Sequence, residues 1–232
     1  MTYYVKSSIM SLKEDILLLD EEVDVMALYQ RLLDEFGYNQ PILREEIAYG
    51  SYSKPWIYNE LKKLCDEGLL IRFDKGVYYI PTQTVLGPSL LDPRKVIEKR
   101  YISATGSVYG YYGGQILMNR LGLSTQMPNV LEVYTNNEAS RVRDIDVGRQ
   151  KVRLRSSRVT VTADNVAVLS FLELMNNLSA DSIDENGREI IIRYIEQNRI
   201  SSKDISGYAA NFPDKVMRNL IESEVIYSVA RE

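Results

Sequence analysis

The sequence predicts an α+β protein with an N-terminal winged helix-turn-helix, followed by a C-terminal mixed α/β domain with a small sheet and a helical tail. Three observations lead to this prediction. Helically spaced apolar residues precede short β-type runs in residues 1–81, charged and apolar residues alternate in the middle of the chain, and helical spacing returns after residue 164. The 232 residues, 45% of them hydrophobic and 26% charged, are enough for two modest domains.

The predicted N-terminal domain covers residues 1–81. Leu28, Leu32 and Leu33 recur at helical spacing before Gly37, and residues 42–49 offer a second short helix.

A third helix is predicted over residues 53–67. Ser53 is a polar cap, Pro55 lies in the first turn, and one apolar stripe follows, made of Ile57, Leu61 and Leu64. Two β-type runs, 69–73 and 77–80, are then joined by Asp74, Lys75 and Gly76, which predicts a hairpin. Three helices and a hairpin are the elements of a winged helix-turn-helix.

Residues 82–92 carry no periodic pattern and are predicted to be a linker. The C-terminal domain then covers residues 93–232. Its first part, 93–163, is predicted to contain helices at 94–101 and 115–121 and strands at 130–135, 141–147 and 151–155. Its second part, 164–232, is predicted to be a helical tail with helices at 166–178, 188–197, 202–210 and 214–223.

Composition excludes several classes of function. The chain has no histidine, which removes the commonest general base and zinc ligand, and its one cysteine, Cys65, can form neither an internal disulfide nor a thiolate cluster. We therefore expect no catalytic residues, no metal and no cofactor, and a protein that is not an enzyme. No segment has the roughly 20 apolar residues of a membrane helix, so we expect a cytoplasmic protein without a membrane partner.

The net charge of −4 is unevenly distributed. Residues 92–163 hold 12 basic and 6 acidic residues, a net charge of +6, whereas residues 1–81 and 164–232 each carry −5. The middle of the chain is therefore basic between two acidic ends.

The helix at 53–67 has the character of a recognition helix, with one apolar face and an opposite face of polar and cationic side chains that could reach DNA. A module that binds protein is the alternative, because the domain as a whole is acidic. The candidate DNA-binding residues are those of the helix and Lys75 in the hairpin turn. They are Ser53, Lys54, Trp56, Tyr58, Asn59, Lys62, Lys63 and Lys75.

A run of cations follows in the predicted strands, where alternation should put apolar side chains on one face and cations on the other. This face is either a solvated surface or a surface that binds phosphates or an acidic partner. Its residues are Arg141, Arg143, Arg149, Lys151, Arg153, Arg155 and Arg158.

Two further patterns are of kinds that occur in catalytic sites. Asp144 and Asp146 should share one face of a strand, as in a two-metal nucleotidyltransferase, but the Gly-Ser turn that such enzymes place shortly before the pair is missing. The glycines match neither a phosphate-binding loop nor a dinucleotide fingerprint, and we expect them to allow close helix packing and a tight turn: Gly106, Gly110, Gly113 and Gly114.

Three strings carry a resemblance to a known family. They are GLLIR at residues 68–72, GVYYIP at 76–81 and GGQILMNRLGLSTQMP at 113–128. With these strings in this order, nearly the whole chain resembles the AbiEi-like antitoxins, an abortive-infection, type IV toxin-antitoxin family of bacterial regulators.

The resemblance implies a function for each domain. The winged helix would bind inverted repeats in promoter DNA and repress its own operon, and the C-terminal domain would counteract a nucleotidyltransferase-like toxin, with or without a stable complex. The alternative is a module that binds protein or RNA and neutralises such a toxin directly.

Overall fold

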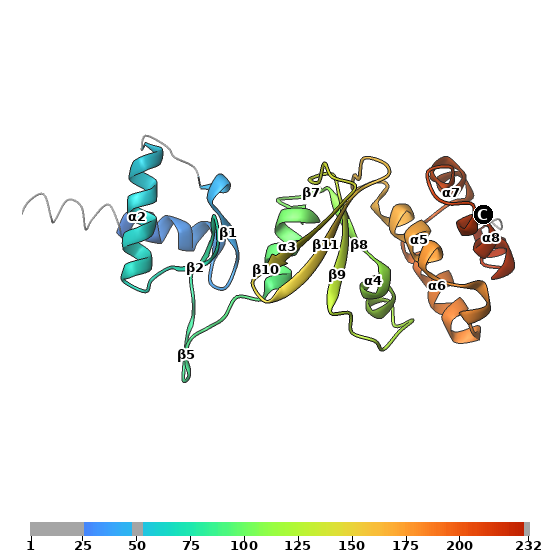
Figure 1. Cartoon of the computed structure of the whole chain (residues 1–232), viewed down its shortest axis with the longest axis horizontal. Coiled ribbons are helices and arrows are strands. Elements are labelled where there is room, and N and C mark those ends of the chain that lie inside the picture. Colours follow the sequence, from blue (N-terminus) through green and yellow to red (C-terminus); the bar gives the residue numbers. More distant parts are fainter. Residues whose placement is uncertain (1–25, 48–52, 230–232) are drawn as a thin grey trace, which may run out of the picture. The chain divides into compact units, whose positions relative to one another are not determined.

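The computed structural model describes residues 26–47 and 53–229, and in this part the chain is a mixed α+β protein (Figure 1). Residues 1–25 of the predicted first domain, residues 48–52 and residues 230–232 lie outside the described part. The chain divides into two compact units, Met1–Lys95 and Val96–Glu232. Each unit has a hydrophobic core of its own.

The first unit packs two helices against a small sheet. One helix covers residues 26–36, and the other is α2 (Lys54–Asp66). The antiparallel sheet has the order β1-β3-β2, with the strands β1 (Ile42–Leu43), β2 (Ile71–Asp74) and β3 (Val77–Tyr79). The two helices, β1 and the residues that flank the β2–β3 hairpin meet in one core, made of Leu28, Leu32, Ile42, Ile47, Ile57, Leu61, Leu64, Leu70 and Ile80. The predicted helix at 53–67 and the predicted hairpin at 69–80 are confirmed.

The short helix predicted over residues 42–49 is wrong in its described part. Ile42 and Leu43 form β1 and pair with Tyr78 and Val77 of β3. Only a single 3₁₀ turn follows, η1 (Arg44–Glu46). The pairing partner lies some 35 residues further along the chain, so local spacing carries no sign of it.

The segment predicted as a linker, residues 82–92, contains a hairpin. The hairpin consists of β4 (Gln83–Thr84) and β5 (Gly87–Pro88), which pair antiparallel. The Thr84 hydroxyl closes its turn by donating to the carbonyl oxygen of Gly87 at 2.7 Å. Strands of two residues are too short to show alternation, so the sequence pattern could not reveal them. The hairpin belongs to the first unit, because the division falls between Lys95 and Val96.

The second unit is built on a four-stranded sheet with the order β10-β11-β9-β8. β9 and β11 are parallel, and the other neighbours are antiparallel. The strands are β8 (Gly110–Gly113), β9 (Val130–Thr135), β10 (Val142–Val147) and β11 (Gln150–Ser156). The three predicted strands are confirmed within one residue at each end, and β8 was not predicted.

Two helices and a second small hairpin complete this part of the chain. The helices are α3 (Pro93–Tyr101), which contains the boundary between the units, and α4 (Gly114–Arg120). The hairpin consists of β6 (Ser103–Ala104) and β7 (Ser107–Val108).

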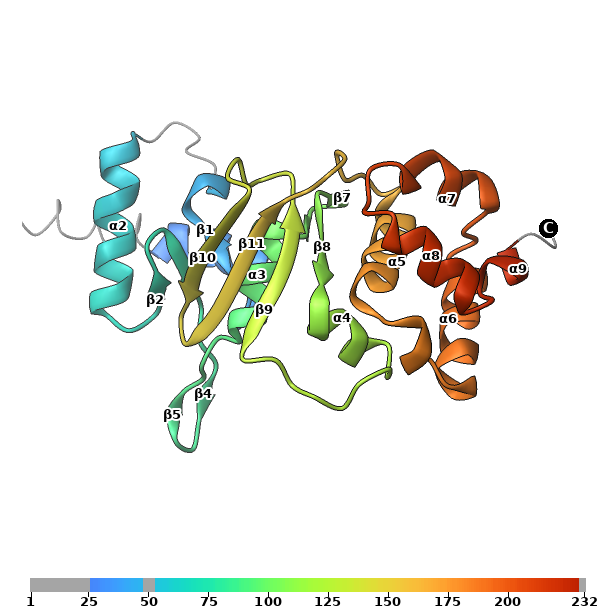
Figure 2. The same ribbon diagram turned by 45° about the vertical axis from the view of Figure 1, so that its right-hand side comes forward.

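The two faces of the four-stranded sheet are covered to different extents. One face carries the buried side chains of Leu131, Val133, Val152 and Leu154, and α3 lies behind this face in Figure 2. The opposite face is covered over β8 and β9, where Tyr134 Oη donates to the buried carboxylate of Glu173 at 2.9 Å. On this same side, β10 and β11 carry side chains that are exposed or half-buried.

The C-terminal part is a helical bundle around α5 (Val166–Asn177), whose residues 168–175 are all buried. Around it lie η2 (Ala180–Ser182), α6 (Glu185–Gln197), α7 (Ser202–Ala209), α8 (Lys215–Glu222) and α9 (Ile226–Val229). The predicted helical tail is confirmed. Among the helices of residues 26–47 and 53–229, none is long and apolar enough to cross a membrane.

Candidate nucleic-acid interface

The outward side of α2 begins at a defined cap. The hydroxyl of Ser53 accepts the backbone N–H of Trp56 at 3.3 Å, and Pro55 occupies the first turn, where a missing N–H costs no helical hydrogen bond. Ile57, Leu61 and Leu64 anchor the opposite side in the core. Four of the predicted contact residues are exposed on the helix, namely Lys54, Tyr58, Asn59 and Lys62.

Three other predicted contact residues have structural roles. Ser53 is the cap, and Trp56 is half-buried against the core of the first unit. Lys63 pairs with the carboxylate of Glu60 at 3.1 Å. Glu60 is only 3% exposed, so its negative charge is turned inward and matched by Lys63. The exposed cations that remain on the outward side of α2 are Lys54 and Lys62.

One cation of this side was not predicted. The guanidinium of Arg44, in η1, lies over the ring of Tyr58 with Cζ 4.9 Å from the ring centroid. A cation on an aromatic face holds both side chains in place. Nothing in the spacing of Arg44 and Tyr58 along the chain signals this contact, because it depends on how η1 packs beside α2.

The eighth predicted contact residue, Lys75, is exposed in the turn between β2 and β3. The carboxylate of Asp74 accepts the backbone N–H of Lys75 at 2.6 Å, and Gly76 takes a φ of 72°, which favours glycine. The turn predicted from Asp74, Lys75 and Gly76 is confirmed.

The strand register of the second unit divides the predicted basic face. Residues directly opposite each other in neighbouring strands point to the same side. Arg153 is opposite Asp144, and Lys151 is opposite Asp146, whereas Arg143 is opposite the buried Leu154. The expectation of one cationic face is therefore wrong: β10 places its aspartates, and not its arginines, beside the cations of β11. We call this side of the outer strands the charged face; it consists of Glu132, Asp144, Asp146, Lys151, Arg153 and Arg155.

Most arginines of this region have partners. Arg153 binds both carboxylate oxygens of Asp144, at 2.8 and 2.9 Å, and its guanidinium lowers the pKa of that carboxyl below its usual value. Arg155 pairs with Glu132, and Arg143 pairs with Glu138 at 2.7 Å. Arg158 lies over the ring of Phe212 at 5.3 Å. The remaining predicted members, Arg141, Arg149 and Lys151, are exposed.

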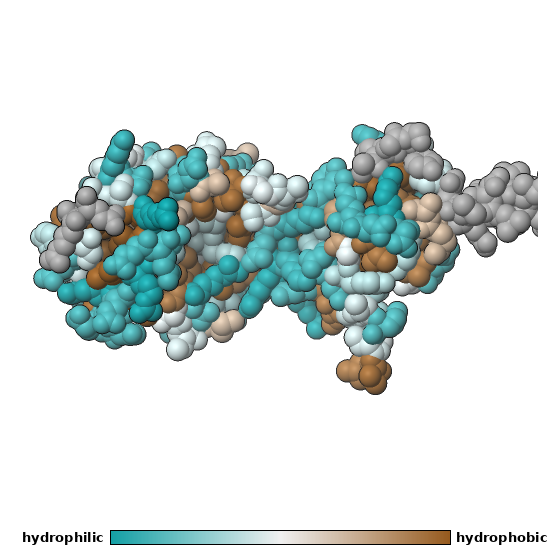
Figure 3. Space-filling model, turned by 180° about the vertical axis from the view of Figure 1, so that it is seen from behind, coloured by the Kyte–Doolittle hydropathy of each residue, from teal (hydrophilic) through white to brown (hydrophobic). Residues whose placement is uncertain are grey.

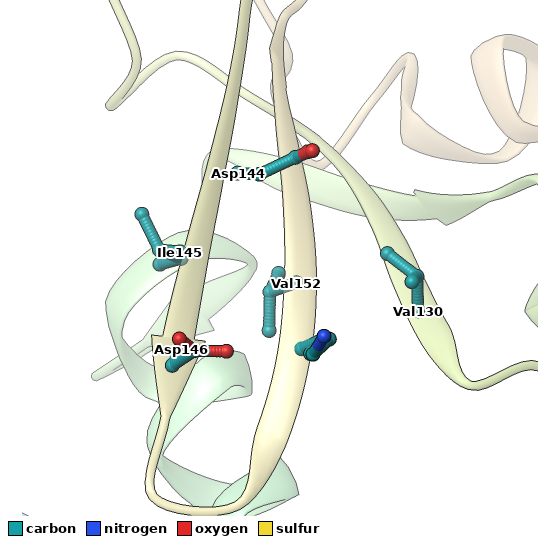
Figure 4. Close-up of a pocket in the computed structure, with 6 residues that line it drawn as sticks. Val130, Asp144, Ile145, Asp146 and Val152 are labelled. Atoms are coloured by element: carbon teal, nitrogen blue, oxygen red, sulfur yellow. The ribbon is translucent and has the colours of Figure 1, made fainter.

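A shallow hollow of about 210 Å³ lies at the end of the charged face (Figure 4). Its lining includes Asp144, Asp146, Lys151 and Val130. Asp144 and Asp146 share one face, as predicted from their spacing, but Asp144 is engaged by Arg153. Within residues 26–47 and 53–229, no group of three or more acidic or cysteine side chains is arranged to hold a metal ion.

One family matches the chain, over residues 42–203, and it is described as a family of unknown function, DUF6088. The match covers more than two thirds of the 232 residues. The chain belongs to the DUF6088 family. None of the curated proteins matches it.

The matched range shows which elements the DUF6088 family shares with this chain. It begins at β1, includes α2, both hairpins of the first unit and the complete four-stranded sheet, and ends in α7. The exposed side of α2 and the charged face therefore both lie inside the DUF6088 match. The helix at residues 26–36 and most of the last three helices lie outside it.

Proposed function

We propose that this chain is a transcriptional repressor that binds inverted repeats in its own promoter through an N-terminal winged helix-turn-helix. The observation that carries the proposal is the outward side of α2, where Lys54, Tyr58, Asn59 and Lys62 are exposed while the opposite side is anchored in the core. A recognition helix contacts base edges chiefly with its N-terminal residues. These four side chains lie in the first three turns of α2.

The arrangement of the first unit supports this proposal. A helix at residues 26–36, the turn η1 and then α2 are followed by the β2–β3 hairpin, with β1 pairing against β3. A winged helix-turn-helix has this order of elements, in which α2 is the recognition helix and the turn carrying Lys75 is the wing. Arg44 beside Tyr58 adds a cation to the same surface.

The acidic balance of the first unit is the main objection to DNA binding, and the position of its charges answers it. The phosphate backbone of DNA is attracted by the charges of the surface that it contacts, and not by the net charge of the whole domain. Glu60, the acidic residue in the middle of α2, is buried and paired with Lys63. Glu60 therefore contributes no exposed carboxylate to the outward side of α2.

We further propose that the chain acts without an enzymatic step as the antitoxin of a type IV abortive-infection system, as its resemblance to the AbiEi-like antitoxins implies. The second unit would counteract a nucleotidyltransferase-like toxin. A second candidate function is direct binding of that toxin by the charged face. The ion pairs of Arg153 with Asp144 and Arg155 with Glu132 favour a protein partner of mixed charge over an RNA, because paired arginines offer less attraction to phosphates.

The experiment that tests the repressor is a titration of the DNA upstream of the chain's own gene, at several salt concentrations. The variant carries Lys54→Ala and Lys62→Ala. Each phosphate contact contributes about 0.9 to the slope of log affinity against log salt. We therefore expect weaker binding and a slope reduced by roughly 2.

The matched control carries Lys203→Ala and Lys215→Ala, which removes two exposed lysines from the second unit and changes the net charge equally. This control should bind as the wild type does. Equal affinity and equal salt slope for wild type and the α2 variant, with both proteins folded, would refute α2 as the DNA-contacting helix.

A further inference from the structure

The β4–β5 hairpin presents the most exposed large apolar side chains of the described chain. Val85 and Leu86, at its tip, are fully exposed, and Leu90, just after it, is 89% exposed. The tip stands clear of the neighbouring surface as a hydrophobic projection in Figure 3. Exposed apolar residues gathered in one short segment mark interaction sites.

The hairpin is held firmly at its base. The backbone N–H of Thr82 donates to Ser89 Oγ and the N–H of Ser89 donates to the carbonyl oxygen of Thr82, both at 2.9 Å. Tyr79 Oη donates to the carbonyl oxygen of Ser89 at 2.9 Å, and Asn39 Nδ2 donates to Thr82 Oγ1 at 3.0 Å. A partner that docks on a segment ordered in advance loses less conformational entropy.

The charge of this segment narrows the choice of partner. Residues 82–91 contain no charged side chain, whereas residues 1–81 carry a net charge of −5. A nucleic acid would meet no cation on the hairpin, and a strongly charged protein would find no counter-charge there. A second copy of this chain brings an equally neutral segment.

Twofold symmetry favours an uncharged contact surface. In a symmetric dimer the same patch contacts itself, so a charge on the axis would face its own copy and repel it. The neutral tip avoids this repulsion. β4 and β5 also form a sheet of only two strands, so each has an outer edge on which a strand of a second copy can pair.

We propose that the β4–β5 hairpin is the surface through which two copies of this chain associate, tip against tip. The position of the hairpin is compatible with the proposed DNA binding; this step and the effect of an inverted repeat rest on that proposal, and the association itself does not. In Figures 1 and 2 the hairpin projects from the end of the first unit opposite to the end at which α2 begins. Contact between α2 and DNA therefore leaves the hairpin open to a second copy.

The size of the surface sets the strength of the association. Stable interfaces use about 20 to 30 residues on each side, and residues 82–91 supply at most half as many. The association is therefore weak in free solution and becomes effective where two copies are held close together, as on an inverted repeat.

Sedimentation of the full-length chain without DNA, over a wide range of protein concentrations, tests the proposal independently of DNA binding. The wild type should show reversible association at high concentration, and Val85→Ser with Leu86→Ser should abolish it. The matched control, Met217→Ser with Ile221→Ser, removes two exposed apolar side chains from α8 and should associate as the wild type does. A wild type that stays monomeric throughout, or a hairpin variant that associates equally well, overturns the proposal.

Cross-linking gives a second measurement that places the contact. In a chain carrying Cys65→Ala and Leu86→Cys, a short bis-maleimide should join two copies efficiently, because Leu86 lies near the axis. A chain carrying Cys65→Ala and Ile221→Cys should give only the yield of random collisions. Equal yields from the two positions would contradict a tip-to-tip contact. Binding of a toxin to the hairpin in place of a second copy would contradict it as well. Neither result changes the affinity of α2 for a single half-site, so failure of this proposal is distinguishable from failure of the repressor.

Discussion

At Gly110, β8 passes so close to two backbone carbonyls that no side chain fits. A Cβ built there would lie 1.9 Å from the oxygen of Tyr101 and 2.7 Å from the oxygen of Tyr134. At Gly113 a Cβ would lie 2.5 Å from the ring of Tyr134. These contacts confirm that Gly110 and Gly113 allow close packing, although the neighbours are the end of α3, a strand and an aromatic ring, where packed helices were expected.

We predict that Gly110→Ala destabilises the protein by about 3 kcal/mol, because backbone atoms cannot move aside as a flexible side chain can. Gly207→Ala is the matched control. Gly207 lies inside α7 with open space around it, and alanine there should stabilise by about 0.5 to 1 kcal/mol. Urea unfolding of both variants measures the difference, and a Gly110→Ala protein as stable as the wild type would show that β8 does not run as described.

Among single residues of the α2 surface, the sequence indicated the exposed side chains and missed the paired ones. Asn59 lies outward because helical spacing puts it opposite Ile57 and Leu61, whereas Lys54 is exposed because it begins the helix. Helical spacing also placed Trp56 and Lys63 among the candidates, but one packs on the core and the other neutralises a buried carboxylate. Such partners depend on side-chain reach, which a residue pattern does not contain.

The N-terminus of α7 shows how a single element is fixed by its cap. Ser201 Oγ accepts the backbone N–H of Asp204 at 3.2 Å, and the Asp204 carboxylate accepts the hydroxyl and the backbone N–H of Ser201, at 2.7 and 2.9 Å. The hydrogen bond from the Ser201 hydroxyl lowers the pKa of Asp204, and its backbone N–H adds to this effect. The reciprocal pair satisfies two N–H groups that would otherwise lack helical partners.

We predict that Ser201→Ala costs about 1 kcal/mol of stability at pH 7. Because the pKa of Asp204 is lowered on folding, its contribution is present above the ordinary aspartate pKa and is lost as the pH falls through the folded value. The gap between wild type and Ser201→Ala should therefore narrow in acid. Ser206→Ala, in the same helix but away from the cap, should be nearly neutral at every pH. Thermal unfolding between pH 7 and pH 3 measures this, and a constant gap would contradict the role of the carboxylate.

Elements with strong local periodicity were predictable, and elements made by pairing were not. The tail helices and β9 to β11 agree with the sequence because their apolar residues repeat at the period of the element. β1, β8 and the β4–β5 hairpin have no such repeat: β1 and β4 are two residues long, and β8 reads Gly-Tyr-Tyr-Gly. Likewise, the alternation in β10 was visible, but which of its faces lies beside Arg153 is decided by the register with β11.

The whole molecule consists of two units, each with a core that uses its own residues. The first turn of α3 carries part of its own support, because the Asp92 carboxylate accepts the backbone N–H of Arg94 at 2.9 Å. A chain that begins at Asp92 therefore keeps α3 complete, including the buried Val96 and Ile97.

We predict that a fragment of residues 92–232 unfolds in one cooperative transition, does not bind the promoter, and retains part of the rescue from the toxin. A fragment of residues 1–95 should show the reverse: promoter binding without rescue. Calorimetry, DNA titration and a growth assay with the toxin measure these properties. Rescue by residues 1–95 alone would overturn this division of labour.

The parallel pairing of β9 with β11 fixes an order of events during folding. The chain leaves β9, travels to the outer edge of the sheet to form β10, and turns back at Gly148 to place β11 between the two. The β10–β11 hairpin contains only local contacts, so it can form within microseconds as soon as both strands exist. Its insertion beside β9 closes a longer loop and comes later. On the ribosome, β9 therefore waits with an open edge until residue 156 has emerged, and the sheet is completed by a preformed hairpin and not strand by strand.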